Sequence, residues 1–168
     1  MNQAEETRLL RKIDQWNEAD AFSRCIQVIE AIPEKERSYQ LTLKLSRAYS
    51  NLAVLGDNGA HSRDGEVDGK LLWHAIELLE SIRPQGENDP YWNGRMGYAH
   101  LMAHSSSAIA YEYGKRWLSL FPENLDAQKF VQDCEQYLAE EKRLALDMKE
   151  REEIIQSETL DDKKEDAK

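Results

Sequence analysis

Apolar residues recur along this chain at intervals of three and four positions, the spacing that places side chains on one face of an α-helix. No run of alternating β-branched and polar residues predicts a strand. The pattern therefore predicts an all-α protein of seven helices, with their apolar faces in the segments 5–16, 21–32, 38–52, 72–82, 90–103, 110–120 and 124–138.

Three of these segments resemble one another, which indicates an internal repeat. They are Ala21–Pro33, Leu72–Pro84 and Ala110–Pro122, each with a small residue near its start and a proline at its end. Each follows another amphipathic segment, so the repeated unit is a pair of helices. A chain built this way forms a scaffold, and scaffolds commonly hold other molecules.

Local signals predict where helices begin and where the pattern breaks. Ser38 and Asn124 are placed to cap helices, and Asp89 can cap a helix whose first residue is Pro90. The segment Gly56–Lys70 carries four glycines among polar residues, which predicts a loop inserted between two helices. Beyond residue 140 apolar side chains thin out, predicting an extension of the last helix over 141–156 and a disordered charged tail over 157–168.

The composition of the chain argues against several classes of function. The chain has 168 residues, 40% of them hydrophobic and 32% charged, with a formal net charge of −10. No basic stripe is visible, which argues against nucleic-acid binding. No segment is long and apolar enough to predict a signal peptide or a membrane span, so a cytoplasmic protein without membrane contact is expected. The two cysteines lie in apolar helical patterns and predict buried side chains rather than a disulfide or metal site.

The helix pairs resemble the tetratricopeptide repeat (TPR). The best copy covers residues 89–123, and its two helices match the family pattern at Trp92, Met96, Gly97, Leu101, Ala110, Tyr113, Leu118 and Pro122. Small residues such as Gly97 and Ala110 suit positions where paired helices approach closely. The resemblance covers about residues 5–122. It implies a right-handed superhelix of about three stacked antiparallel helix pairs within a domain 1–140, closed by a C-terminal capping helix.

In TPR proteins the first helices of the pairs line a concave groove that binds protein or peptide segments. The resemblance therefore implies a non-enzymatic adaptor or scaffold, with the groove residues Leu43, Arg47, Ser50, Asn51, Tyr91, Arg95, Tyr98, Leu101 and Met102. Two arginines in an acidic protein favour an acidic or carboxylate-bearing partner. Alternatively, each arginine pairs with an acidic neighbour of its own chain. Only Arg95 matches the family's carboxylate clamp, which excludes binding of chaperone tails.

The sequence also fits two other functions. Leu144, Met148 and Ile155 lie on the last helix, and their exposure would favour a structural protein that self-associates. His100 and His104 stand four residues apart, the spacing of two metal ligands on one helix face, and would fit a metal protein or enzyme. No third ligand, nucleophile motif or phosphate-binding loop accompanies them, so we predict no catalytic residue, metal or cofactor.

Overall fold

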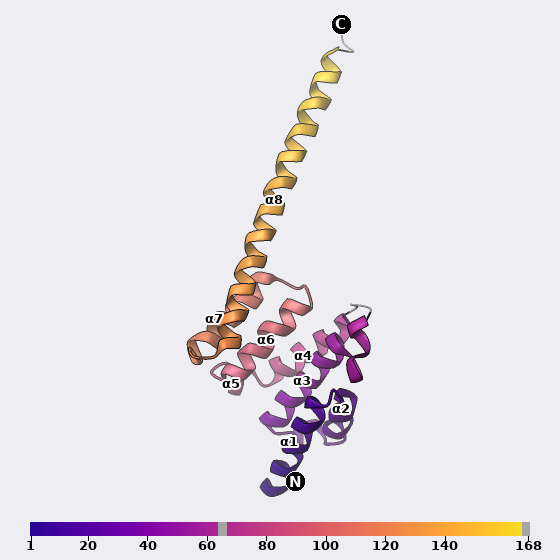
Figure 1. The fold of residues 1–168 in the computed structure, drawn as a ribbon, viewed down its shortest axis with the longest axis vertical. Helices are drawn as coiled ribbons and strands as arrows, with labels where there is room; N and C mark the ends of the chain where they lie inside the picture. Colours follow the sequence, from indigo (N-terminus) through magenta and orange to yellow (C-terminus); the bar gives the residue numbers. More distant parts are fainter. Residues whose placement is uncertain (64–66, 166–168) are drawn as a thin grey trace.

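The computed structural model describes residues 1–63 and 67–165, and the side chains of residues 1–60 and 67–153. Over the described residues the regular elements are helices and there is no strand, which confirms the all-α prediction. Three pairs follow one another along the body in Figure 1: α1 (Gln3–Glu18) with α2 (Phe22–Glu30), α3 (Tyr39–Leu55) with α4 (Gly69–Ser81), and α6 (Pro90–Met102) with α7 (Ser107–Leu120). The short helical turns η1 (Glu34–Glu36) and α5 (Arg83–Gly86) join successive pairs, and η2 (Asp57–Arg63) lies within the second pair, between α3 and α4.

The pairs contact one another in a regular order. The first helices form a row, because α1 touches α3 and α3 touches α6. The second helix of each pair also packs against the helix that begins the next unit: α2 against α3, α4 against α6, and α7 against α8. This order brings residues of α3 and α6, far apart in the sequence, onto one shared surface.

Helix starts follow the side-chain caps that the sequence predicts. The Ser38 hydroxyl accepts from the Leu41 N–H at 3.2 Å, and the Asp89 carboxylate accepts from the Tyr91 N–H at 2.8 Å. Asn124 Oδ1 accepts from the Ala127 N–H at 2.8 Å at the start of α8. Each cap satisfies a backbone donor that the first helical turn leaves unpaired.

The first half of the segment between α3 and α4, Asp57–Arg63, is helical where the sequence predicts a loop. Asp57 Oδ1 accepts from the Ser23 N–H at 2.9 Å, and the Asn58 N–H donates to the Asp20 carbonyl at 3.0 Å. Helix α2 begins after Ala21, which offers no side-chain cap, so Asp57 supplies that cap from a distant part of the chain. The insertion thus begins as short 3₁₀ turns, kinked at Asn58 and Gly59, against the first pair. Residues 64–66 of the predicted loop lie outside the described residues.

Glycine is required where α6 meets α7 and α8. A Cβ atom on Gly97 would lie 2.9 Å from the Phe130 ring and 3.4 Å from the Ala110 carbonyl oxygen. Gly94, one turn earlier, would place a Cβ 3.0 Å from the Trp117 indole. Gly97 is therefore at a close approach, as the sequence predicts, and Gly94 lets the indole of α7 lie directly on α6.

Helix α8 (Leu125–Glu165) closes the body and then leaves it, as Figure 1 shows. Its first turns bury Ala127, Phe130 and Cys134 against α7. Tyr137, which the pattern places inward, is 53% exposed, although α7 still reaches α8 one turn later, where the Ser107 hydroxyl donates to Glu141 at 2.6 Å. The helix continues to Glu165, past the predicted start of the disordered tail at Ser157, and residues 166–168 lie outside the described part.

Candidate functional site

A cavity of about 380 Å³ lies between α3 and α6 and is completed by single residues of α4 and α7. We call it the α3–α6 groove. Its residues recur at the helical spacing along each first helix, so the exposed face of α3 forms one wall and that of α6 the other. The lining residues are Arg47, Ser50, Asn51, Val54, Leu55, Leu72, Tyr91, Gly94, Arg95, Tyr98, Met102 and Trp117.

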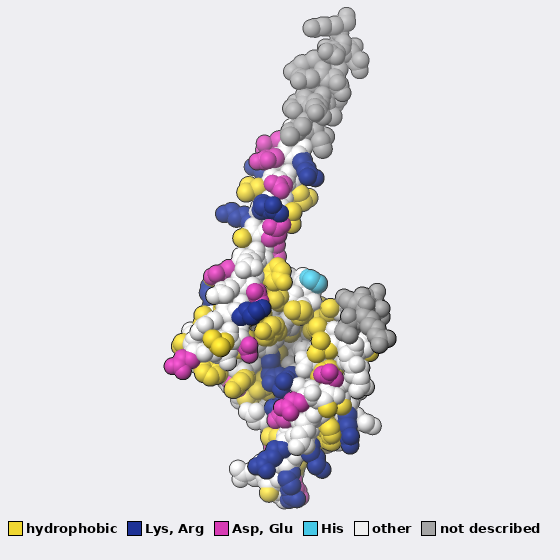
Figure 2. All heavy atoms as spheres, viewed as in Figure 1, with side chains coloured by type: hydrophobic (Ala, Val, Ile, Leu, Met, Phe, Trp, Pro, Cys, Tyr) yellow, Lys and Arg dark blue, Asp and Glu magenta, His cyan; other side chains and the backbone are white. Residues whose placement is uncertain are grey.

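The structure brings most of the sequence-predicted groove residues together. Seven of the nine line the cavity: Arg47, Ser50, Asn51, Tyr91, Arg95, Tyr98 and Met102. Figure 2 shows basic side chains lying between hydrophobic ones on one face of the helical body. Residues from two helices separated by the α3–α4 insertion thus share one site.

Leu43 and Leu101 do not line this cavity. Leu43 is only 3% exposed and belongs to the core cluster that contains Trp92 and Met96. Leu101 packs against the cluster of α7 and α8 that includes Ala110 and Phe130. Each stands on a side of its helix that a neighbouring helix covers, and Leu43 lines the adjoining second cavity instead.

Several residues that line the groove were not predicted from the sequence. Val54 and Leu55 continue the face of Asn51 by one helical turn, and that spacing could have identified them. Leu72 and Trp117 come from the second helices of two pairs, and only the packing of those helices places them here.

A second cavity of about 510 Å³ adjoins the groove and shares Arg47, Tyr91, Arg95 and Trp117 with it. The walls that it does not share are mainly polar: Gln40, Leu43, Lys44, Asp89, Asn124 and Asp126. None of the residues lining the first cavity is acidic. The two arginines therefore stand where an apolar compartment meets a polar one.

Arg47 has an uncharged partner within the protein. The Asn17 amide of α1 faces its guanidinium, and we assign the amide oxygen to that side because two N–H groups point at it. The oxygen then accepts from Arg47 Nε at 3.1 Å and from Nη2 at 3.0 Å. Arg47 forms no ion pair with any residue whose side chain is described.

Arg95 has no comparable partner. Its Nε is buried and makes no hydrogen bond, and among the described side chains none forms an ion pair with it. Burial lowers the pKa of Arg95 to about 10, and the nearby positive charge of Arg47 acts in the same direction. Asp89, the carboxylate that acts most strongly on Arg95, is engaged by the Tyr39 hydroxyl at 2.6 Å and by the Tyr91 N–H. The guanidinium is therefore a charged donor left without an acceptor.

Trp117, which lines the same two cavities, carries a second unpaired donor. The residue is 7% exposed, and its indole N–H is buried without a hydrogen-bond partner. Its ring is held by Gly94 beneath it and by Tyr98, which meets it edge to face at 6.0 Å between centroids. Buried donors are normally satisfied, and these two have no partner although their residues line both cavities.

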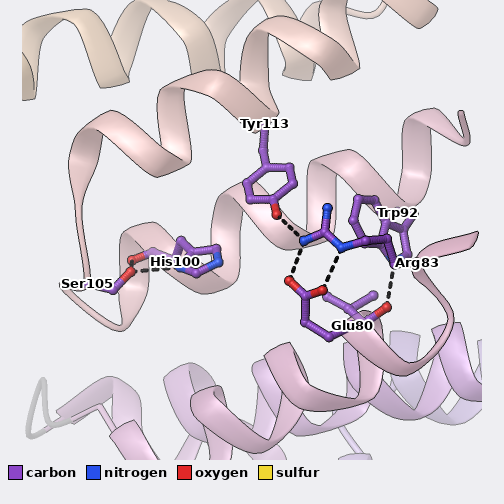
Figure 3. Close-up of polar contacts among 7 residues, drawn as sticks. Glu80, Arg83, Trp92, His100, Ser105 and Tyr113 are labelled. Atoms are coloured by element: carbon purple, nitrogen blue, oxygen red, sulfur yellow. Dashed lines mark hydrogen bonds and ion pairs between the residues drawn. The ribbon is translucent and has the colours of Figure 1, made fainter. Parts of the chain in front are cut away.

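The histidines form a different arrangement from the metal pair considered above. His100 is 8% exposed, its Nδ1 lies 2.8 Å from the Ser105 hydroxyl, and its ring stacks on Tyr113 with centroids 5.6 Å apart (Figure 3). Burial lowers its pKa, which favours the neutral ring. His104 is exposed in the turn after α6. In the described part of the chain no three His, Cys, Asp or Glu residues are grouped to hold a metal ion.

Beside His100, polar contacts tie α4, α6 and α7 together. Arg83 donates two hydrogen bonds to Glu80, at 2.7 and 2.5 Å, and one to the Tyr113 hydroxyl at 2.9 Å (Figure 3). The Trp92 indole N–H donates to the Leu79 carbonyl at 2.9 Å. The charged and aromatic groups of this face are thus paired with one another, unlike Arg95 and Trp117.

Comparison with protein-family models, with curated proteins and with solved structures finds no match to this chain. Among the helices of the described residues, none has the length and apolar character needed to cross a membrane.

Proposed function

We propose that this protein is a non-enzymatic interaction module that binds a protein or peptide segment in the α3–α6 groove. The observation that carries the proposal is that seven residues chosen from the sequence as partner-binding line one cavity, together with an unpaired arginine. Aromatic and arginine side chains are enriched among the residues that dominate binding energy at interfaces. The groove offers both in a concave setting.

The proposal includes a TPR-like arrangement of the helix pairs. Its support is the repeated contact order, in which each second helix packs on the helix that begins the next unit. The close approach at Gly97 and the fully buried Ala110 agree with the small positions of the family pattern. Such a stack leaves the row α1, α3 and α6 to form a continuous binding surface.

A selection experiment tests the function. Immobilised full-length protein is exposed to a library of short random peptides, and the retained peptides are compared with those held by Ser50→Arg, which fills the groove from α3. Ser119→Arg is the matched control, because Ser119 is exposed on α7 and does not line the groove. We expect peptides that bind the native protein and the control but not Ser50→Arg. An absence of retained peptides, or equal retention by Ser50→Arg, would refute the proposal.

A second candidate function is self-association through α8. Tyr137, Leu144, Leu146 and Met148 are 53%, 49%, 55% and 64% exposed on the part of α8 that leaves the body. Light scattering on the full chain over a range of concentrations tests this idea. A dimer that Leu144→Glu and Met148→Glu abolish would support it, and a monomer at all concentrations would exclude it.

A further inference from the structure

The lining residues and the unpaired donors of the groove indicate which ligand chemistry would fit it. Resting on the function proposed above, we infer that the groove takes an internal partner segment in which a large apolar side chain stands next to a carboxylate. The apolar side chain enters the first cavity, and the carboxylate accepts hydrogen bonds from Arg95 and Trp117 at the junction with the second cavity.

The apolar half of this motif follows from the walls of the first cavity. Val54, Leu55, Leu72, Tyr98 and Met102 line it, and Leu55 and Tyr98 are 41% and 42% exposed at its rim. A volume of about 380 Å³ lies at the small end of the range for ligand pockets. It suits one or two side chains rather than a whole folded surface, and burying them against these walls supplies the favourable apolar contact.

The carboxylate half follows from the unpaired donors. Arg95 Nε and the Trp117 N–H both lack an acceptor, and both residues line both cavities. Arg47 places a second positive charge nearby without an acidic partner. The two predicted alternatives were a partner's carboxylate or acidic neighbours of the same chain, and the described side chains show no ion pair at either arginine. A carboxylate matches the planar fork of a guanidinium and can accept from the indole as well.

The second cavity limits how acidic the ligand can be. Asp89 and Asp126 line it, and its one lysine, Lys44, is already paired with Asp14. A segment that continues into this compartment therefore meets carboxylates as well as cations, because Arg47 and Arg95 line it too. A single carboxylate followed by neutral or basic residues fits this mixed lining better than a run of acidic residues or a polyanion.

The motif can be measured with an array of short random peptides, acetylated and amidated so that they carry no terminal charge. Full-length protein and the Ser50→Arg and Ser119→Arg variants are applied to it. We expect the groove-dependent peptides to share a large apolar residue adjacent to one Asp or Glu. Replacing that acid by its amide should weaken binding about tenfold or more, because a hydrogen-bonded charge is lost.

A double-mutant cycle then assigns the contact. Arg95→Met and Trp117→Phe should each weaken the acidic peptide and leave its amide counterpart nearly unchanged. Groove-dependent peptides without acidic enrichment, or with acidic runs, would overturn this inference while the proposed function stands. If no peptide depends on the groove, the proposed function fails and the inference falls with it. The change from acid to amide in the peptide needs no protein variant, so a variant that fails to fold does not weaken the test.

Discussion

Replacing Arg95 by methionine should make the free protein more stable, although the replaced residue is central to the proposed site. Methionine keeps an unbranched side chain and a helix propensity close to that of arginine. The substitution in α6 therefore removes the guanidinium while preserving most of the stem that packs between α3 and α6. What changes is the cost of holding an unpaired charged donor in the fold.

The size of the gain follows from the surroundings of Arg95. An unsatisfied buried donor costs about 1–3 kcal/mol, and Arg95 Nε is such a donor. Burial and Arg47 lower the pKa of Arg95 to about 10. At pH 7 the group is charged in both folded and unfolded chains, and the folded chain is the less favourable place for that charge. Because part of the side chain still reaches solvent, we expect a gain of about 1–2 kcal/mol, or a rise of about 2–8 °C in Tm.

Thermal and urea denaturation at pH 7 measure this difference, with Arg47→Met as the matched control. Arg47 donates two hydrogen bonds to Asn17, whose side chain is only 7% exposed. Its removal should therefore destabilise the protein by about 1–2 kcal/mol, the opposite sign. If Arg95→Met were as destabilising as Arg47→Met, Arg95 would be satisfied in the free protein, and the case for an external acceptor would be lost.

Two further changes test the fold around the site. Gly97→Leu should cost about 1–3 kcal/mol by overpacking against Phe130, and an unchanged Tm would show that α6 does not cross α8 there. Asp57→Ala should cost about 1 kcal/mol at pH 7 through loss of the α2 cap. Burial raises the pKa of Asp57, but hydrogen bonds from Ser23 and Phe22 outweigh burial and lower the pKa below its usual value. The ionised carboxylate therefore stabilises the folded protein at any pH above the pKa that Asp57 has in the unfolded chain. Urea denaturation should show the Asp57→Ala difference shrinking as the pH falls below about 4, and a constant difference would contradict the cap.

Much of the fold was predictable because helices and their ends are local properties. Caps at Ser38, Asp89 and Asn124 form as predicted, since each depends on residues within one turn of the chain. The last helix shows where local patterns fail. The apolar period continues through Tyr137, but whether that side chain is buried depends on how the helices pack around it, and it is 53% exposed.

Most residues that line the groove could be predicted from the sequence, but the partners of its charged side chains could not. The helical face that contains Arg47 and Asn51, and the one that contains Arg95 and Tyr98, could be identified from spacing within each helix. Whether each arginine is hydrogen-bonded could not be predicted, because that depends on which groups of other helices face its guanidinium. Spacing alone treats Arg47 and Arg95 alike, yet one is bonded to Asn17 of α1 and the other has no acceptor.

The sequence by itself thus determined the helices, most of their inward faces and the residues that α3 and α6 offer to a groove. Those features follow from backbone hydrogen bonding and side-chain period, which act over a few residues. Only the tertiary structure decided that Leu72 and Trp117 complete the walls, that Asp57 caps α2, and that Arg95 stays unpaired. These features arise from contacts between segments distant in the chain, and such contacts depend on how helices pack rather than on any local pattern.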